Sequence, residues 1–232
     1  MLTINDLHFS YAEKEVLKGL NLNAEVGTIH GILGMNGSGK TTLFKTIYGF
    51  NTKESGECLF NEKPVSKRDI AFLETSNFFY SYMKGQEYLE LCALQNPDFN
   101  IENWNQLFQL PLNNLVETYS TGMKKKLAFL GIIALNRPIL ILDEPFNGVD
   151  FESSEVLYEI LKRLRKKGKL ILLSSHIIES LTNICDEVSY LSNGVIERKY
   201  LKGEFKQMEV DLRELIQEKV TAKLDSIFEN TS

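Results

Sequence analysis

A glycine-rich segment in the first quarter of the chain carries its clearest chemical pattern. Residues 34–41 read Gly-Met-Asn-Gly-Ser-Gly-Lys-Thr, which matches the phosphate-binding pattern G-x-x-x-x-G-K-[ST] at every fixed position. Such glycines let backbone N–H groups converge on phosphate oxygens, and the following helix adds a favourable potential. Lys40 can reach the β- and γ-phosphates, and the Thr41 hydroxyl can ligate Mg²⁺. A chance match has odds of roughly one in a hundred in a chain of this length, so we expect nucleotide binding.

Two adjacent acids end an apolar run in the second half of the chain. Residues 139–142 are followed by Asp143 and Glu144, a pattern typical of a buried parallel strand whose carboxyl end binds ligands. Asp143 can hold Mg²⁺ directly or through water, and Glu144 can accept a proton from an attacking water as general base. Taken alone, the pair can equally be two solvated acids that cap a strand. The phosphate-binding pattern favours the catalytic interpretation.

A histidine follows another apolar run. His176 comes shortly after residues 169–174, and this strand should end at the same sheet edge as Asp143. At that edge the imidazole can contact a γ-phosphate. A lone histidine at a strand end is more often structural, so both roles stay open on the residues alone.

Alternating strand-like and helix-like segments predict the framework that positions these residues. Asn193-Gly194 is the turn signal of a β-hairpin. We expect strands at residues 2–9, 20–24, 28–33, 57–60, 70–73, 139–142, 169–174, 188–191 and 195–200. We expect helices from the glycine-rich loop to residue 48 and at residues 87–94, 101–107, 124–135 and 152–167, with a charged helix from about residue 211.

The alternation indicates an α/β fold with parallel strand pairing. Strand signals fade between residues 78 and 136, so this stretch is interpreted as an α-helical subdomain inserted into the sheet domain. The predicted division is an ATP-binding α/β core at residues 1–77 and 137–210, a helical insertion at residues 78–136 and a helical tail at residues 211–232.

The composition limits the classes of protein to consider. A formal net charge of −5 gives no overall attraction to nucleic acid, and no nucleic-acid partner is expected. The three cysteines are widely spaced and odd in number, which argues against a disulfide framework or a zinc site and suits a reducing cytosol. The N-terminus lacks the plan of a signal peptide, and the apolar runs are far shorter than the roughly 20 residues of a spanning helix. A membrane role would therefore come through a partner.

A segment between the nucleotide motifs makes the pattern specific. Residues 119–123 read Tyr-Ser-Thr-Gly-Met. The order of phosphate loop, this segment, carboxylate strand and late histidine resembles the nucleotide-binding subunits of ABC transporters, over residues 2–200. The family's signature reads Leu-Ser-Gly-Gly-Gln, of which this chain keeps Ser120 and Gly122. The departures are similar to a Tyr-Ser-x-Gly-Met variant in ATPases paired with ABC-2-type membrane subunits, many of which are exporters.

The resemblance implies a P-loop NTPase sheet core with an N-terminal antiparallel β portion and an inserted α-helical subdomain. It implies an ATPase that uses ATP and Mg²⁺, with Glu144 and His176 positioning the attacking water and Lys40 offsetting charge. The implied Mg²⁺ ligands are Thr41 and Asp143. The implied ATP-binding residues are Tyr11, whose ring would stack on adenine, Gly34, Asn36, Gly37, Ser38, Gly39, Lys40, Thr41 and Thr42.

The resemblance also implies two subunits that pair head to tail around two ATP molecules. The signature residues of one subunit would reach the ATP of the other, and Asp150 would be the acid of the loop that crosses the interface. ATP would close the pair, and hydrolysis would let it open. The signature residues concerned are Ser120, Thr121, Gly122 and Met123.

One family position does not match. The family places a glutamine after a strand such as residues 70–73, where this chain reads Leu-Glu-Thr-Ser at residues 73–76. Our alignment puts Thr75 opposite the glutamine, with Glu74 as the neighbouring possibility. The Thr75 hydroxyl can hold a water near Mg²⁺, although its short side chain cannot reach as glutamine does.

Three lysines occupy the first turns of the signature helix. Ser120 is expected to cap this helix, and Lys124, Lys125 and Lys126 follow where the helix dipole favours acids. Each lysine should be unfavourable by a few tenths of a kcal/mol unless an anion approaches. A solvated basic face and a γ-phosphate bound in trans are both open interpretations.

The expected partners are a separate transmembrane permease subunit and a second ATP-binding subunit, most simply an identical copy. Residues 78–82 place four aromatics where the family receives a helix from its membrane subunit; we expect at least half of them in the core and one or two along a docking groove. The chain would then work at the cytoplasmic face of the cell membrane as a peripheral protein. The alternatives are a soluble ABC-type ATPase in cofactor assembly or DNA maintenance, and an ATP-binding regulator with little turnover.

Overall fold

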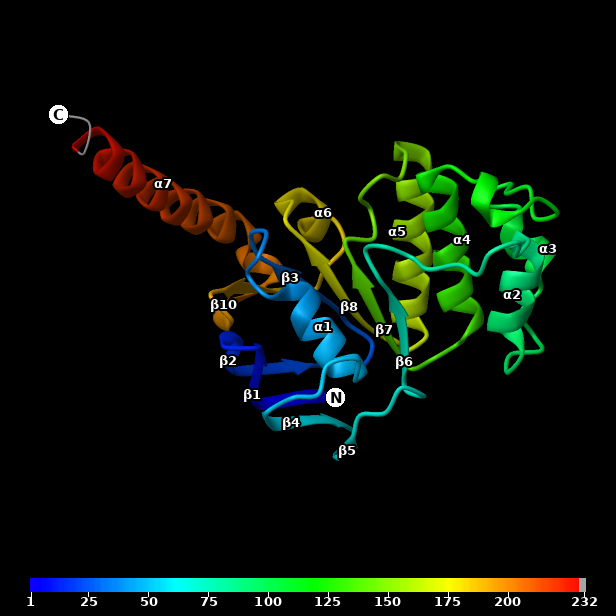
Figure 1. The fold of residues 1–232 in the computed structure, drawn as a ribbon, viewed down its shortest axis with the longest axis horizontal. Coiled ribbons are helices and arrows are strands. Elements are labelled where there is room, and N and C mark those ends of the chain that lie inside the picture. The colour runs from blue at the N-terminus through cyan, green and yellow to red at the C-terminus, as the bar shows by residue number, and fades with distance from the viewer. Residues whose placement is uncertain (230–232) are drawn as a thin grey trace.

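Two β-sheets form the framework of the computed structural model, which describes residues 1–229 (Figure 1). The smaller sheet is antiparallel and has the order β2-β1-β4-β5. It consists of β1 (Leu2–Tyr11), β2 (Lys14–Ala24), β4 (Ser55–Phe60) and β5 (Lys63–Pro64). The larger sheet has the order β10-β9-β3-β8-β7-β6, and all of its pairs are parallel except β9 with β10. The predicted α/β fold with an antiparallel N-terminal portion is confirmed.

The larger sheet brings the ends of its central strands to one edge. It consists of β3 (Ile29–Leu33), β6 (Ile70–Leu73), β7 (Ile139–Asp143), β8 (Leu170–Ser175), β9 (Glu187–Ser192) and β10 (Val195–Leu201). The strands β3, β7 and β8 are buried along their whole length, as their unbroken apolar runs predict. Asp143 pairs with Ser174, and Leu33 pairs with Ser175. The residues that follow these strands therefore meet at the same edge.

Helices cover both faces of the larger sheet. The first helix, α1 (Lys40–Tyr48), lies between the two sheets and shares a core with residues of β1 and β2. A second core joins the other face to α4 (Thr121–Ala134), α5 (Phe151–Lys166) and α6 (Ile178–Thr182). The remaining helical elements are α2 (Gly85–Ala93), α3 (Ile101–Asn105), α7 (Phe205–Glu229) and two 3₁₀ turns, Val116–Thr118 and Lys202–Glu204. Within residues 1–229, no helix combines the length and hydropathy needed to cross a membrane.

Most predicted boundaries lie within three residues of the observed ones, and two predicted starts are each about six residues too late. The strand expected at residues 20–24 begins at Lys14, because Leu17 faces the core and the whole segment pairs with β1. The charged helix expected from residue 211 begins at Phe205, because Phe205, Met208 and Leu212 pack into the core. Beyond this packed first part, α7 projects away from the body of the molecule (Figure 1).

The aromatic segment after β6 also differs from its prediction. Residues 74–83 form neither helix nor strand. Phe79 packs against Tyr88 of α2, with ring centroids 5.0 Å apart. The other three aromatics are exposed, because the segment runs over the surface: Phe78 is 78%, Tyr80 66% and Tyr82 79% accessible. The expectation that at least half would be core is therefore wrong. The boundaries of the helical insertion at residues 78–136 stay a prediction.

Candidate nucleotide site

The phosphate-binding pattern lies between β3 and α1, where the sequence places it. Gly39 precedes the helix with a φ of 111°, a left-handed conformation that glycine adopts without strain. Lys40 is almost fully buried, and its Nζ donates hydrogen bonds to the carbonyl oxygens of Gly34, at 2.7 Å, and Met35, at 3.3 Å. The buried Oγ of Ser38 has no hydrogen-bond partner among the described residues. The Ser38 hydroxyl has a free hydrogen-bonding capacity, and the Lys40 ammonium is hydrogen-bonded to carbonyl oxygens of the loop. Such a loop is suited to bind an anion.

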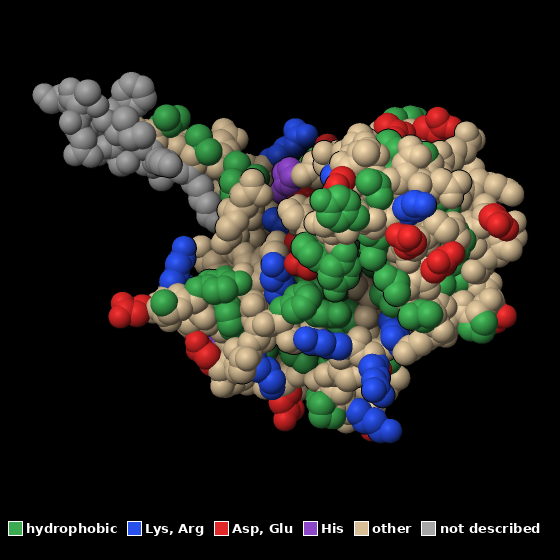
Figure 2. Space-filling view, turned by 45° about the vertical axis from the view of Figure 1, so that its right-hand side comes forward, with side chains coloured by type: hydrophobic (Ala, Val, Ile, Leu, Met, Phe, Trp, Pro, Cys, Tyr) green, Lys and Arg blue, Asp and Glu red, His purple; other side chains and the backbone are tan. Residues whose placement is uncertain are grey.

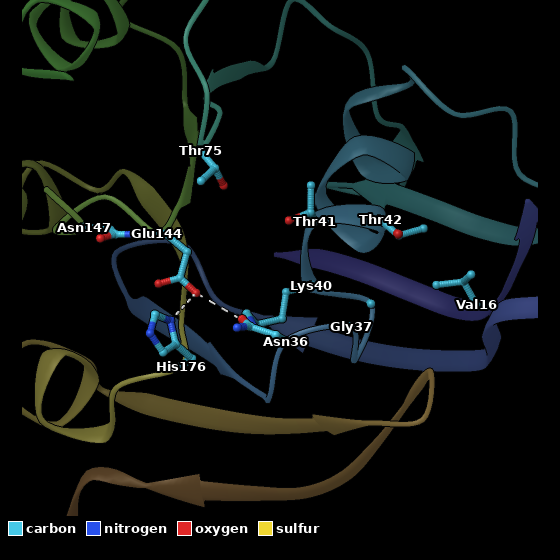
Figure 3. Close-up of a pocket in the computed structure, with 11 residues that line it drawn as sticks. Val16, Asn36, Gly37, Lys40, Thr41, Thr42, Thr75, Glu144, Asn147 and His176 are labelled. Carbon is cyan, nitrogen blue, oxygen red and sulfur yellow. Dashed lines mark hydrogen bonds and ion pairs between the residues drawn. The ribbon is translucent and has the colours of Figure 1, made fainter. Parts of the chain in front are cut away.

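A cavity of about 580 Å³ opens beside this loop (Figure 3). Its volume falls in the range of small-molecule sites. The walls come from β2, the loop and α1, the segment after β6, the loop after β7 and the end of β8. The lining residues are Val16, Asn36, Gly37, Gly39, Lys40, Thr41, Thr42, Thr75, Glu144, Asn147 and His176.

Asp143 lies at the base of the site and is completely buried. Its Oδ2 accepts hydrogen bonds from the Oγ1 atoms of Thr41 and Thr75, both at 2.7 Å. Its Oδ1 accepts a third from the Oγ of Ser174, at 2.6 Å. A buried carboxylate needs such donors because its charge is otherwise strongly unfavourable away from water. Three elements, α1, the segment after β6, and β8, thus converge on one carboxylate.

Glu144 follows with a left-handed backbone, at a φ of 52°. This conformation is uncommon for a residue with a side chain and marks a local strain that the surroundings must maintain. Its N–H donates to the Oγ of Ser174, at 3.0 Å. Its Oε1 lies 3.0 Å from the Nδ1 of His176 and 3.8 Å from the Nζ of Lys40. Figure 3 shows these three side chains pointing toward one another across the cavity.

The charges of the site act on Lys40. Burial lowers the pKa of the Lys40 ammonium, while the carboxylates of Glu144 and Asp143 oppose that shift. The lysine therefore stays within reach of two negative charges and partly out of water. A polyphosphate entering the cavity would add negative charge next to it and favour its charged form.

The oxygen atoms around Asp143 fit a hard divalent cation. The Thr41 and Thr75 hydroxyls and the carboxylates of Asp143 and Glu144 supply only oxygen donors, as Mg²⁺ prefers. The described residues contain no cluster of three or more His, Cys, Asp or Glu side chains suited to a metal. Such a sparse site suits Mg²⁺, which usually keeps water and takes further oxygens from substrate phosphates.

Most of the predicted ATP-binding residues meet at the cavity, but not all. Asn36, Gly37 and the run 39–42 line it, together with Glu144 and His176. Gly34 and Ser38 shape the loop without lining the cavity. Tyr11 lies at the end of β1, where it packs edge-on against Phe9 and its hydroxyl accepts a hydrogen bond from Asn51, at 3.3 Å. Its stacking on adenine stays a prediction.

The signature residues lie apart from this cavity, at the start of α4. The Oγ of Ser120 accepts a hydrogen bond from the N–H of Met123, at 3.2 Å, which confirms the predicted helix cap. Ser120 and Thr121 are exposed, and Gly122 is half-buried. Gly122 lies against the loop after β7, since a Cβ there would sit 3.1 Å from the carbonyl oxygen of Gly148. None of the four signature residues lines the cavity.

The solvated-face interpretation of the lysine run is wrong for two of its members, and the interpretation in trans stays a prediction. Lys125 is buried, and its Nζ donates to the carbonyl oxygens of Glu144, at 2.6 Å, and Asn147, at 3.1 Å. Lys126 contacts the Oδ2 of Asp150, at 3.3 Å. Their partners are in the same chain, on the loop that packs beside the helix, so neither side chain belongs to a solvated basic face. A sequence pattern cannot show a contact that depends on this packing.

Thr75, and not Glu74, lies beside Asp143, and its equivalence to the family's glutamine stays a prediction. Its hydroxyl reaches Asp143, whereas Glu74 turns away to form an ion pair with Lys45, at 3.2 Å. Asp150 caps α5 by accepting from the N–H and Oγ of Ser153, both at 2.8 Å. These hydrogen bonds, with the nearby Lys126, hold the pKa of Asp150 at about 2.

Sequence reasoning missed three residues of the site. Val16 and Asn147 line the cavity, and Ser174 joins Asp143 to the backbone of Glu144. Ser174 had a signal, because it is a polar residue at the end of an apolar strand predicted to lie beside Asp143. Val16 had none, since it belongs to the part of β2 that was not predicted.

Comparison with known proteins agrees with the geometry. The family model described as "ABC transporter" matches residues 17–147. The chain is 30% identical over 231 residues to the putative ABC transporter ATP-binding protein AlbC of Bacillus subtilis, covering 92% of this chain and 95% of that protein.

Solved structures show the same architecture. An ATP-binding subunit of an ABC transporter has a TM-score of 0.84 at 27% identity and covers 94% of this chain and 98% of its own. A dimeric ATP-binding cassette in a post-hydrolysis state, bound to ADP and Pi, shares the fold with a TM-score of 0.78 at 22% identity, over 87% of this chain and 99% of its own. The chain belongs to the ABC transporter family, as one of its ATP-binding, ATP-hydrolysing subunits.

Proposed function

We propose that this cavity binds ATP with its phosphates on the loop at residues 34–41 and hydrolyses it with Glu144 as general base. The observation that carries the proposal is the position of Glu144, whose carboxylate faces His176 at 3.0 Å and Lys40 at 3.8 Å over the same cavity. A base must lie within hydrogen-bond reach of the water that it activates, and the space between these side chains provides that reach.

Residues of this chain would bind the phosphates and activate the attacking water. Backbone N–H groups of the loop and the Ser38 hydroxyl would bind phosphate oxygens, and Lys40 would turn from its two carbonyl acceptors to the γ-phosphate. His176 would hold the attacking water and orient the carboxylate that takes its proton. Asn147 and Thr75 line the same cavity and would lie around this water.

We propose Mg²⁺ as the cofactor, held by Thr41 and Asp143 with Thr75 beside them. When bound it would supply positive charge to the β- and γ-phosphate oxygens. The Thr41 and Thr75 hydroxyls now donate to the same oxygen of Asp143, so both can turn their lone pairs toward a cation while Ser174 keeps its hold on the other oxygen.

A second copy of the chain is proposed to complete the site. The start of α4, with an exposed Ser120 and a half-buried Gly122, lies outside the cavity and would not reach a nucleotide bound in the cavity of its own chain. A head-to-tail pair would bring the helix start of one subunit to the γ-phosphate of the other, where its N–H groups favour an anion. Asp150, in the loop beside α4, would lie at that interface.

A transmembrane permease is the proposed partner of this pair, with the chain on its cytoplasmic side. Three of the four aromatics at residues 78–82 are exposed, and no other part of the described chain covers them. Hydrophobic side chains also gather at the centre of the face drawn in Figure 2, with Lys and Arg side chains below them. Exposed apolar area of this kind is typical of a docking surface. Export is favoured over import through the signature variant.

The variant Glu144→Gln tests the proposed chemistry. Removing the base should lower hydrolysis of Mg-ATP about 10²- to 10⁴-fold while leaving binding of a fluorescent ATP analogue intact. In excess Mg-ATP the variant should elute as a dimer on gel filtration, because the closed pair is no longer released by hydrolysis. Glu197→Gln, on the exposed face of β10, makes the same chemical change elsewhere and should behave as the wild type. Full hydrolysis by Glu144→Gln would refute the assignment, and a persistent monomer would count against pairing through the signature.

A further inference from the structure

Lys125 is a buried cation that the proposed reaction does not use. Its side chain is 5% accessible, and its ammonium donates to the carbonyl oxygens of Glu144 and Asn147, at 2.6 and 3.1 Å. Among the described residues no carboxylate forms an ion pair with it. Burial lowers the pKa of Lys125, while the charges of Glu144 and Asp143 act in the opposite direction. A buried ammonium held by carbonyls alone is unfavourable compared with an apolar side chain of the same length, which points to a role beyond packing.

The contacts of Lys125 fall on the backbone of the proposed general base. Glu144 is held on both sides: Ser174 accepts from its N–H at 3.0 Å, and Lys125 donates to its carbonyl oxygen. Between these two hydrogen bonds the residue keeps its left-handed φ of 52°. A residue held in such a conformation depends on its surroundings to stay there. The direction of the Glu144 side chain toward His176 follows from this backbone geometry.

The helix that carries Lys125 is the signature helix. Lys126, the next residue of α4, contacts Asp150 at the far end of the same loop and the Oγ of Ser153 in the first turn of α5. Gly122 of α4 lies against Gly148 in the middle of it. The loop between β7 and α5 is therefore attached to α4 at its beginning, middle and end.

We propose that Lys125 is a positioning residue, which fixes Glu144 against the signature helix so that the catalytic carboxylate follows the position of that helix. The proposal rests on the proposed function, in which α4 contacts the nucleotide of a second subunit. When the second subunit closes onto α4, a shift of this helix would move Glu144 of the same chain through the Lys125 side chain. In the part of the chain that the structure describes, the Lys125 ammonium donates hydrogen bonds to the carbonyl oxygens of Glu144 and Asn147 only.

Lys125→Met and Lys125→Arg test this role. Methionine keeps the length and removes the donors, so the kcat of Mg-ATP hydrolysis should fall about 10- to 100-fold, as expected when a catalytic group is misplaced. The KM for ATP, the Kd of a fluorescent ATP analogue and the unfolding temperature should stay close to wild type. Arginine keeps charge and donors and should recover most of the lost kcat. Lys162→Met, which removes an exposed ion pair with Glu159 on α5, should change none of these values.

Three outcomes would overturn the inference. One is an unchanged kcat in Lys125→Met. Another is a loss of kcat that comes with a matching loss of nucleotide affinity and unfolding temperature, which would show a structural role. The third is an equal loss in the methionine and arginine variants. A failure of the proposed function looks different: the wild type would bind Mg-ATP without hydrolysing it, or Glu144→Gln would hydrolyse it normally.

Discussion

At the scale of single residues, the site depends on hydroxyl groups that hold a buried charge. Asp143 has no access to solvent, and the hydroxyls of Thr41, Thr75 and Ser174 stand in for the water it has lost. Thr41 and Thr75 line the cavity, so their hydroxyls can give up the hydrogen bond to Asp143 and ligate a cation instead. Ser174 is fully buried and does not line this cavity, so its contribution is structural.

Ser174→Ala tests that distinction. The change leaves one oxygen of a buried carboxylate and the N–H of Glu144 without their partner, so unfolding free energy should fall by about 1–3 kcal/mol. Hydrolysis should fall as well, because the backbone of Glu144 loses one of its two supports. Denaturant unfolding and steady-state kinetics measure the two effects. Ser175→Ala, on the same strand, removes only one hydrogen bond to the N–H of Ile177 and should be milder; an equal or larger loss there would contradict the argument.

The residues that the sequence reveals are those whose chemistry is local. The loop at residues 34–41 combines its glycines, lysine and threonine within one turn, and Asp143 and Glu144 are neighbours, so their order alone predicts their use. Lys125 has the opposite character. Its role depends on a helix packing beside a loop about twenty residues away, and its pattern in the sequence is that of any basic helix start.

At the scale of elements, the position of α4 depends on close packing with α2. Gly131 of α4 faces Tyr88 of α2, and a Cβ at this position would lie 2.6 Å from the Tyr88 ring, closer than real Cβ atoms come. Both helices share one core with the larger sheet. The ring fills the space that the missing side chain leaves, so the interhelical distance is set by a glycine in the middle of a helix.

Gly131→Ala should therefore destabilise the protein, although alanine is the better helix former by about 1 kcal/mol. The ring of Tyr88 is partly buried, packs against the core and contacts the ring of Phe79, so it cannot move away freely and overpacking should lower stability by about 1–3 kcal/mol. Gly203→Ala is the matched control, because nothing lies within 4 Å of a Cβ there and the backbone needs no glycine. Thermal unfolding decides the sign: a Gly131→Ala protein as stable as the wild type would show that α2 and α4 can separate without loss.

Helices and strands were predictable where the sequence has a continuous apolar run or apolar residues at regular helical spacing. The strands β3, β7 and β8 are continuous apolar runs, and α5 shows its apolar stripe, so each was expected close to its true place. The start of β2 was missed because its first residues are mostly polar and exposed, and only pairing with β1 extends it. The start of α7 was missed because its buried residues contact a core that the sequence does not show.

At the scale of the whole molecule, the chain has a cavity lined by the nucleotide motifs and an exposed aromatic segment on its surface. The cavity lies at the edge of the larger sheet, and the signature lies elsewhere, at the start of α4 (Figure 1). The segment after β6 links the cavity to the exposed aromatics. It brings Thr75 to Asp143 and, only three to seven residues later, exposes Phe78, Tyr80 and Tyr82. A partner that binds these aromatics would lie within one short loop of the proposed cation site.

The triple variant with Phe78, Tyr80 and Tyr82 changed to alanine tests whether these aromatics bind the membrane partner. Wild-type chain recovered from detergent-solubilised membranes of the native host should bring a polytopic membrane protein with it at near one-to-one, and the variant should lose most of it. Basal hydrolysis of Mg-ATP by the purified variant should stay within about twofold of wild type, because exposed side chains contribute little to stability. Leu201→Ala, an exposed apolar residue at the end of β10, should retain the partner. Full recovery of the membrane protein by the triple variant would place the docking surface elsewhere, and a loss of basal hydrolysis would show that these aromatics support the site itself.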